Sequence, residues 1–124
     1  GIKQPVFTAE INWPAFFTMI KRNRIRYSEL PKFPEVRRDL ALLLDEGVQF
    51  SALRRSAIKA GKKLIRNVSL FDVYRGDKIA EGKKQYAISF TLQDLEKTLT
   101  DVDVEKIMSK ILGTLSHEFG ATLR

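Results

Sequence analysis

Apolar and polar residues alternate along residues 84–92, and this alternation predicts a strand with one apolar and one polar face. The apolar side chains are expected to face the core: Tyr86, Ile88, Phe90 and Leu92. The small and polar side chains are expected on the opposite side: Gln85, Ala87, Ser89 and Thr91. Such a strand belongs to a sheet that is covered by a second layer on one side only.

Two further segments have strand patterns. Residues 36–44 alternate so that two sets of side chains face opposite ways: Leu40, Leu42 and Leu44, against Asp39, Ala41 and Leu43. Residues 68–74 are rich in β-branched and aromatic side chains, and we expect Phe71 and Val73 to face the core. The other side chains of this strand are then expected on the open side: Leu70, Asp72 and Tyr74. A glycine-containing loop, residues 75–83, predicts a hairpin between this strand and the next.

Two segments have the three- and four-residue spacing of amphipathic helices. The first covers about residues 51–63, with Ser51 as its N-cap, and carries one apolar stripe: Leu53, Ala57, Ala60 and Leu64. The second follows Thr100, which is expected to form a capping box with Asp103, and it ends at Gly120. Its apolar stripe is longer: Val104, Ile107, Met108, Ile111, Leu112 and Leu115.

The tail, residues 121–124, is apolar enough to form a last short strand. From residue 36 onwards the predicted order of elements is therefore βαββαβ. This order predicts an α+β fold, a ferredoxin-like sandwich with a four-stranded antiparallel sheet and two helices on one face.

The first part of the chain has a different character. Residues 6–13 have the composition of a strand, which Pro14 ends, and residues 15–21 predict a short helix. Basic residues then crowd the chain, and two prolines follow: Lys21, Arg22, Arg24 and Arg26, then Pro31 and Pro34. We therefore predict two regions, a linker at residues 1–32 that was cut from something larger and a self-contained domain at residues 33–124.

The composition argues against most catalytic chemistry. The chain has no cysteine and one histidine, His117, which argues against a disulfide framework, a thiol nucleophile and a zinc site. We expect no catalytic residue and no metal ligand, and His117 is expected on the surface near the end of a helix. No apolar run approaches the roughly 20 residues that cross a bilayer, so we expect no membrane partner and a cytoplasmic location.

The net charge is +7, and it is distributed unevenly. Residues 1–90 hold 18 Lys and Arg against 9 Asp and Glu, whereas residues 91–124 hold 4 against 6. A basic excess of this kind favours a polyanionic partner such as nucleic acid, although many domains are basic for solubility alone.

On the predicted open face, Asp72 and Gln85 flank small residues, which suits a nucleobase lying flat with its edge hydrogen-bonded. The competing interpretation is an ordinary solvated sheet face, on which only Tyr74 offers a ring. Four basic residues lie near the hairpin and could meet phosphate or simply be solvated: Arg75, Lys78, Lys83 and Lys84. Arg38 and Asp39 could pair with each other or contact RNA.

Several separated motifs occur in a definite order: Phe33-Pro34, Arg38-Asp39-Leu40-Ala41, Phe71-Asp72-Val73-Tyr74, Gly82-Lys83-Lys84, Thr98-Leu99-Thr100-Asp101, and Gly120-Ala121 with Leu123-Arg124. With these motifs the chain resembles the ferredoxin-fold anticodon-binding domain that ends the β subunit of bacterial phenylalanyl-tRNA synthetase. The resemblance covers the whole predicted domain. Residues 1–32 are similar to the stretch that links this domain to the rest of that subunit.

The resemblance implies that the open face receives the anticodon loop of tRNA(Phe) and that its first base is read by Asp72, Gln85 and Arg124. The base would stack on Ala87 and Ala41, and the remaining expected RNA contacts are Tyr74, Lys83 and Lys84. Family members usually have serine where this chain has Gln85, so the geometry of that contact is expected to differ. A carboxylate can accept from guanine's N–H donors, and an arginine can donate to guanine or to phosphate.

The resemblance also implies a parent enzyme, phenylalanine-tRNA ligase, in which the partner α subunit carries the activity within an α2β2 assembly. ATP and magnesium belong to that parent, and this fragment is expected to bind no cofactor and to have no activity alone. Two other classes stay open at this stage: a ferredoxin-like small-molecule sensor using the loop 76–82, and a subunit-packing module that buries the open sheet face.

Overall fold

The computed structural model describes residues 1, 3–20, 25–27 and 29–124. The chain forms two compact units, Gly1–Leu30 and Pro31–Arg124, which are considered separately below.

Among its described residues, the first unit contains one helix, α1, at Trp13–Ile20. It starts two residues earlier than predicted because Asn12 Oδ1 accepts a hydrogen bond from the Ala15 amide at 3.1 Å, which caps the helix. The strand predicted at residues 6–13 is wrong. Its described residues before the helix have no regular structure, since a strand needs a partner for its backbone groups and this unit supplies none among the residues described.

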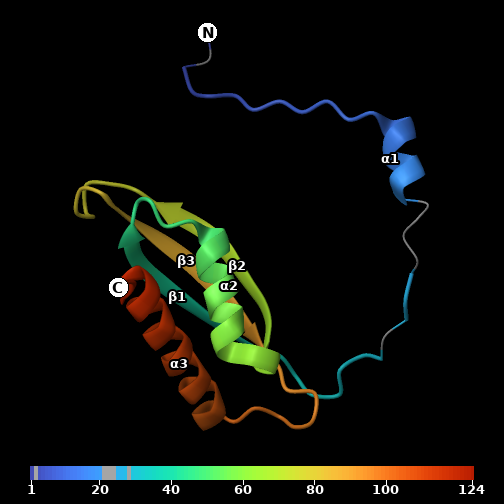
Figure 1. The fold of residues 1–124 in the computed structure, drawn as a ribbon, viewed down its shortest axis with the longest axis vertical. Coiled ribbons are helices and arrows are strands. Elements are labelled where there is room, and N and C mark those ends of the chain that lie inside the picture. Colours follow the sequence, from blue (N-terminus) through green and yellow to red (C-terminus); the bar gives the residue numbers. More distant parts are fainter. Residues whose placement is uncertain (2, 21–24, 28) are drawn as a thin grey trace. The chain divides into compact units, whose positions relative to one another are not determined.

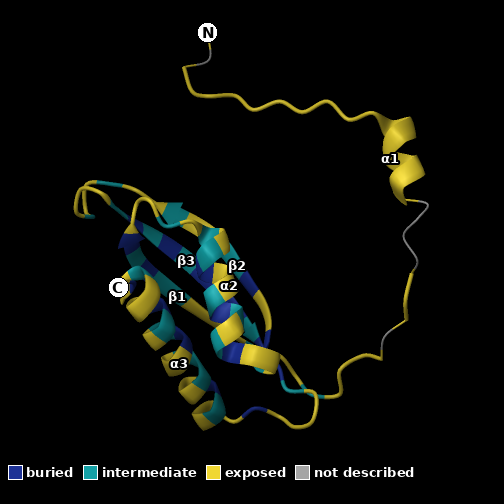
Figure 2. Ribbon diagram, in the orientation of Figure 1, coloured by how far each residue is buried: buried dark blue, intermediate teal, exposed yellow. Residues whose placement is uncertain are grey.

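Figure 2 shows α1 as exposed throughout, and none of its residues is buried. Three of the predicted basic connector residues, Lys21, Arg22 and Arg24, lie outside the described residues.

The second unit is the predicted ferredoxin-like sandwich, and this prediction is confirmed (Figure 1). Its four strands are β1 at Val36–Asp45, β2 at Ile65–Tyr74, β3 at Lys83–Leu92 and β4 at Thr122–Leu123. They pair antiparallel in the order β2-β3-β1-β4. Three helical segments connect them: α2 at Phe50–Gly61, the short 3-10 helix η1 at Lys62–Leu64, and α3 at Asp101–Phe119. Figure 1 shows α2 and α3 on the same side of the sheet, so the other side is left open.

The core lies between the helices and the covered face of the sheet. It contains the predicted alternating positions of the two central strands, all buried: Leu42, Leu44, Tyr86, Ile88, Phe90 and Leu92. The helices contribute buried side chains to this core from their predicted apolar stripes: Leu53, Ala57, Val104, Ile111 and Leu115. Tyr86 reaches the edge of this core, where its hydroxyl donates to the Val48 carbonyl at 3.0 Å.

The helix ends follow the prediction in one case and not in the other. In α3, Thr100 and Asp103 form the predicted capping box, and Gly120 ends the helix with φ 62°. In α2, however, Ser51 is not the N-cap. The cap is Gln49, without a side-chain hydrogen bond, because Phe50 is drawn into the first turn by edge-on packing on the Tyr86 ring.

Strand β2 contains a bulge that the sequence pattern did not predict. Leu70 pairs with Ile88, and the next pair is Asp72 with Ala87, so Phe71 is an extra residue on the β2 side. Two face assignments were therefore wrong: Phe71 is 57% exposed, and Leu70 packs against the core. Val73 packs against the core as predicted.

The bulge also explains why Asp72 is on the open face. Val68 and Leu70 both face the core, so uninterrupted alternation would place Asp72 in the core as well. The extra residue shifts the phase, and Asp72 instead lies opposite Ala87 on the open side. The predicted face of Asp72 is confirmed. The prediction was based on regular alternation, which gave the wrong face for Leu70 and Phe71.

Candidate nucleic-acid interface

Four of the predicted site residues form one row across the open face. Ala41 of β1 lies opposite Ala87 of β3, and Ala87 lies opposite Asp72 of β2. At the other end of the row, the Arg124 amide donates to the Ala41 carbonyl at 3.0 Å. Three interstrand gaps, roughly 14 Å, separate the backbone of Asp72 from the backbone of Arg124. Between them the two alanines leave a floor without bulky side chains.

Gln85 joins this row from the neighbouring position along β3. Its Oε1 accepts a hydrogen bond from Arg124 Nη1 at 2.6 Å, which links two residues that are 39 positions apart in the sequence. The amide nitrogen of Gln85 has no partner among the described residues. The pair therefore presents hydrogen-bond donors above the alanine floor, from the guanidinium and from the amide.

Asp72 supplies the acceptor at the opposite end. One carboxylate oxygen accepts from the Val73 amide at 2.8 Å, which orients the group locally, and the side chain is exposed. A carboxylate held by one backbone N–H keeps acceptor capacity on its second oxygen. The open face thus has an acceptor on β2, donors from the Arg124–Gln85 pair, and two small apolar side chains beside them.

Tyr74 lies on the same face, opposite Gln85 in the β2–β3 register. Its ring leans over the hairpin glycine, because a Cβ atom built on Gly76 would lie 2.5 Å from the tyrosine hydroxyl oxygen. Glycine at this position lets the ring approach the backbone closely.

Lys83 and Lys84 point in opposite directions. Lys83 lies on the open face and pairs with Asp45 at 2.5 Å. Lys84 is only 5% exposed and lies on the covered side, where its Nζ donates to the Glu46 carbonyl at 2.6 Å and sits 4.8 Å from the centre of the Tyr86 ring. The geometry brings Lys83 to the open face and leaves Lys84 out of it.

One polar group on the open face was not part of the predicted site. Asp39 lies one step along the sheet from the alanine row, and both of its oxygens accept from Arg37, at 3.0 and 3.2 Å. Hydrogen bonds from Arg37 and Ser89 lower the pKa of the Asp39 carboxyl. The alternative Arg38–Asp39 pair does not form, since Arg38 pairs with Asp101 at 3.6 Å instead. The alternation of residues 36–44 already placed Asp39 on this face, but nothing in the pattern named its partner.

Within the described residues, no group of three or more histidine, cysteine, aspartate or glutamate side chains is placed to hold a metal ion. No helix in the described part of the chain is both long enough and apolar enough to cross a membrane.

An antiparallel α+β sandwich with one free, polar sheet face defines a ferredoxin-like domain whose sheet is available for binding. The family model described as "Ferredoxin-fold anticodon binding domain" matches residues 31–124. The chain therefore belongs to the family of ferredoxin-fold anticodon-binding domains.

Similar proteins come from several bacteria. The phenylalanine–tRNA ligase beta subunit of Porphyromonas gingivalis is 50% identical over 123 residues, which cover 99% of this chain and 15% of that protein. The corresponding subunit of Methylococcus capsulatus is 42% identical over 124 residues, covering 100% and 15%. That of Geobacillus kaustophilus is 47% identical over 100 residues, covering 81% and 12%. The chain thus spans about 15% of the length of the curated relatives that it matches most fully.

Proposed function

We propose that the open sheet face of this domain binds the anticodon loop of tRNA(Phe) and reads its first base. The observation that carries the proposal is the row that joins Asp72, the two alanines and the Arg124–Gln85 pair. Family membership supports anticodon binding in general, and the names of the relatives support phenylalanine tRNA in particular.

Each residue of the row has a defined role in this proposal. The base lies on Ala41 and Ala87, where the absence of bulk lets its flat face approach the sheet. Asp72 accepts from the N–H donors on guanine's edge, because guanine is the base that presents both a ring and an exocyclic donor there. Arg124 donates to guanine or to its phosphate.

Gln85 and Tyr74 complete the proposed binding surface. Gln85 positions the guanidinium through the 2.6 Å bond and offers its amide N–H to the base. Tyr74 provides a ring for a neighbouring nucleotide. Lys83 supplies positive charge at the end of the face, whereas the position of Lys84 gives no support to a direct RNA contact.

The wider setting is also proposed. We infer that the chain is part of a phenylalanine-tRNA ligase β subunit in the cytoplasm, that residues 1–32 link it to the preceding region of that subunit, and that it assembles with an α subunit in an α2β2 tetramer. In this setting the parent enzyme uses ATP and magnesium, and the present domain contributes tRNA binding without a catalytic residue.

A binding titration tests the proposal. The chain is titrated with an anticodon stem-loop that carries the phenylalanine anticodon and with a second stem-loop in which adenine replaces the first base. The proposal predicts tighter binding of the first RNA, by about 1–3 kcal/mol, as expected for loss of a well-placed base contact. Asp72→Asn removes this preference, since an amide cannot accept from both donors as the carboxylate does.

Asp77→Asn is the matched control, because Asp77 is an exposed aspartate in the hairpin loop outside the row. It should leave the preference unchanged. Equal binding of both RNAs by the wild-type chain, in a titration where binding is measurable, would contradict base reading. Because the parent gains affinity from several domains, undetectable binding calls for the same comparison in the full assembly.

A further inference from the structure

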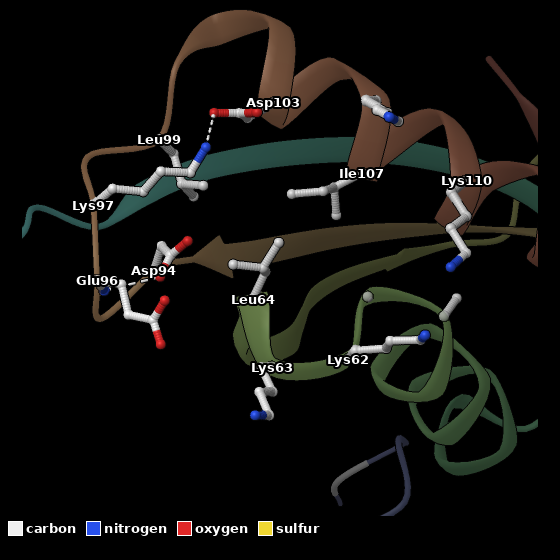
Figure 3. Close-up of a pocket in the computed structure, with 13 residues that line it drawn as sticks. Lys62, Lys63, Leu64, Asp94, Glu96, Lys97, Leu99, Asp103, Ile107 and Lys110 are labelled. Carbon is white, nitrogen blue, oxygen red and sulfur yellow. Dashed lines mark hydrogen bonds and ion pairs between the residues drawn. The ribbon is translucent and has the colours of Figure 1, made fainter.

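A cleft of about 600 Å³ opens in the helical layer, away from the residues of the open face (Figure 3). It lies between the end of α2, η1, the loop at residues 94–99 and the first half of α3. This volume is within the range of sites that hold ligands or protruding side chains. None of the residues in the proposed base-reading row lines it, so it is a separate feature of the domain.

The floor of the cleft is apolar. Leu64 and Ile107 are half-buried and point toward one another from opposite sides, as Figure 3 shows, and Leu99 is buried beside them. All three side chains are continuous with the core, but they still line the opening. Such a floor suits the apolar side chains of a partner better than it suits a phosphate group.

The two ends of the cleft carry opposite charge. At one end, Lys62 and Lys110 lie on the same side in Figure 3, and Lys106 also lines the cleft. None of these lysines forms an ion pair within the described part of the chain. At the other end lie Asp94 and Glu96, where Figure 3 shows them close together.

Lys97 also lies at the acidic end, where its charge is paired with Asp103 at 3.1 Å, and Lys63 lines the cleft beside Leu64. Asp103 and Lys110 are seven residues apart on α3, so the two ends are separated by about 10 Å along the helix axis. A partner therefore meets acid, then an apolar floor, then base, over two helical turns.

Lys62 also has an unusual backbone conformation, with φ 52° and ψ −133°. This region strongly favours glycine, yet the chain keeps a lysine here, at the rim of the cleft. A glycine would relieve the strain and would also remove one of the cations.

We propose that this cleft docks an amphipathic helical segment of another protein, with an apolar stripe for the floor and with acidic and basic side chains at its two ends. A two-turn helix presents its apolar side chains as one stripe between two ends that can carry different charges. Its charged ends complement the lysine end and the Asp94–Glu96 end. A single-stranded RNA fits less well, because the two carboxylates would repel its phosphates and the floor offers them no donor.

An NMR titration with synthetic peptides tests the proposal. Three helical peptides share one leucine stripe and differ in their flanking residues: glutamate at one end and lysine at the other, glutamate at both ends, or lysine at both ends. The bipolar peptide should bind the chain most tightly and should shift the methyl signals of Leu64, Leu99 and Ile107. The peptide with lysine at both ends should bind most weakly.

Charge reversal on the protein sharpens the test. The double variant Lys62→Glu with Lys110→Glu should weaken the bipolar peptide at least about tenfold and strengthen the all-lysine peptide by a similar factor, since two cations at the lysine end are then replaced by carboxylates. Lys59→Glu is the matched control, because Lys59 is an exposed cation on α2 that does not line the cleft. It should change neither affinity by more than about twofold.

Three results would overturn the proposal. One is that no peptide shifts the three methyl signals at concentrations of about 1 mM, the weak limit of a useful interaction. Another is that Lys59→Glu changes binding as much as the double variant does. The third is that a uridine-rich single-stranded RNA shifts these methyl signals while the peptides do not, which would make the cleft a site for nucleic acid.

Discussion

The two faces of the sheet in residues 31–124 are built from the same strands but differ in almost every physical respect. On the covered face, large apolar side chains of β1 and β3 are fully buried under α2 and α3. On the open face, neighbouring positions of the same strands carry alanine, serine, glutamine and aspartate, and the contacts between them are hydrogen bonds and ion pairs. Successive residues of one strand therefore alternate between the core and the proposed binding face.

Because the two faces differ in this way, substitutions can separate the contribution of the sheet to stability from its proposed contribution to binding. A change on the covered face should alter the free energy of unfolding and affect binding only through folding. A change on the open face should alter binding and leave the fold intact, because polar contacts at an exposed surface contribute little to stability. Three of the following predictions compare a residue that packs in the core with a more exposed residue of the same strand, so each comparison tests this separation directly.

The largest effect is expected at Phe90, which has no exposed surface. Phe90→Ala should lower the free energy of unfolding by about 3–5 kcal/mol, because it removes a buried ring and leaves a cavity. Thr91→Ala, its neighbour on the open face, should change it by less than about 0.5 kcal/mol. Urea denaturation measures both, and similar losses at the two positions would contradict the separation.

The adjacent lysines of β3 give the next comparison. Lys84→Ala should cost about 2 kcal/mol, since it removes a buried ammonium from the Glu46 carbonyl and the Tyr86 ring. Lys83→Ala should cost about 0.5 kcal/mol or less, because its pair with Asp45 is solvent-exposed. Thermal or urea unfolding decides the order. A larger loss for Lys83→Ala would show that the two side chains have been assigned to the wrong faces.

The bulge in β2 is tested by Val73 and Phe71. Val73→Ala should cost about 1 kcal/mol because the valine packs against the core, whereas Phe71→Ala should cost less than about 0.5 kcal/mol. Plain alternation along the strand would make both of them core residues. If Phe71→Ala proves the more destabilising change in urea denaturation, the bulge is placed incorrectly.

The smallest effect is the pH dependence from Asp39. Its pKa is lowered by Arg37 and Ser89, so the carboxylate stabilises the folded state above its unfolded pKa, and this contribution is lost as the pH falls through the lowered value. The difference in unfolding free energy between the wild type and Asp39→Asn should therefore be present near neutral pH and shrink below about pH 4. A difference that is constant over this range would exclude the Arg37–Asp39 pair as its source.

Much of the fold could be predicted because the relevant patterns are local. The alternation in β1 and β3 assigned the large buried apolar side chains of those strands correctly, although Ser89 on the open side is also buried, and the capping box and Gly120 marked the ends of α3. Two features depended instead on tertiary contacts. Packing of Phe50 on Tyr86 moved the start of α2, and the strand predicted at residues 6–13 has no partner in its unit as described.

For the candidate site, the sequence predicted which residues share the open face better than it predicted how they contact one another. Asp72 and Gln85 could be assigned to one face, but the Arg124–Gln85 bond joins strands distant in sequence, and no local pattern indicates it. The bulge did leave a signal. Val68 and Leu70 follow one phase of the alternation and Val73 the other, and such a break in phase requires an extra residue between them. The burial of Lys84 follows the same alternation as Tyr86 and Ile88, but a lysine is rarely placed in a core, so its residue type argued against the pattern.

A double-mutant cycle between protein and RNA tests the central claim, that Asp72 reads the first anticodon base. The chain and its Asp72→Asn variant are each titrated with a stem-loop carrying guanine at that position and with one carrying inosine, which lacks only the exocyclic amine. The inosine substitution should weaken binding to the wild type by about 1–2 kcal/mol and should have almost no effect on the variant, because the accepting carboxylate is then absent. An equal loss in both proteins would contradict the claim.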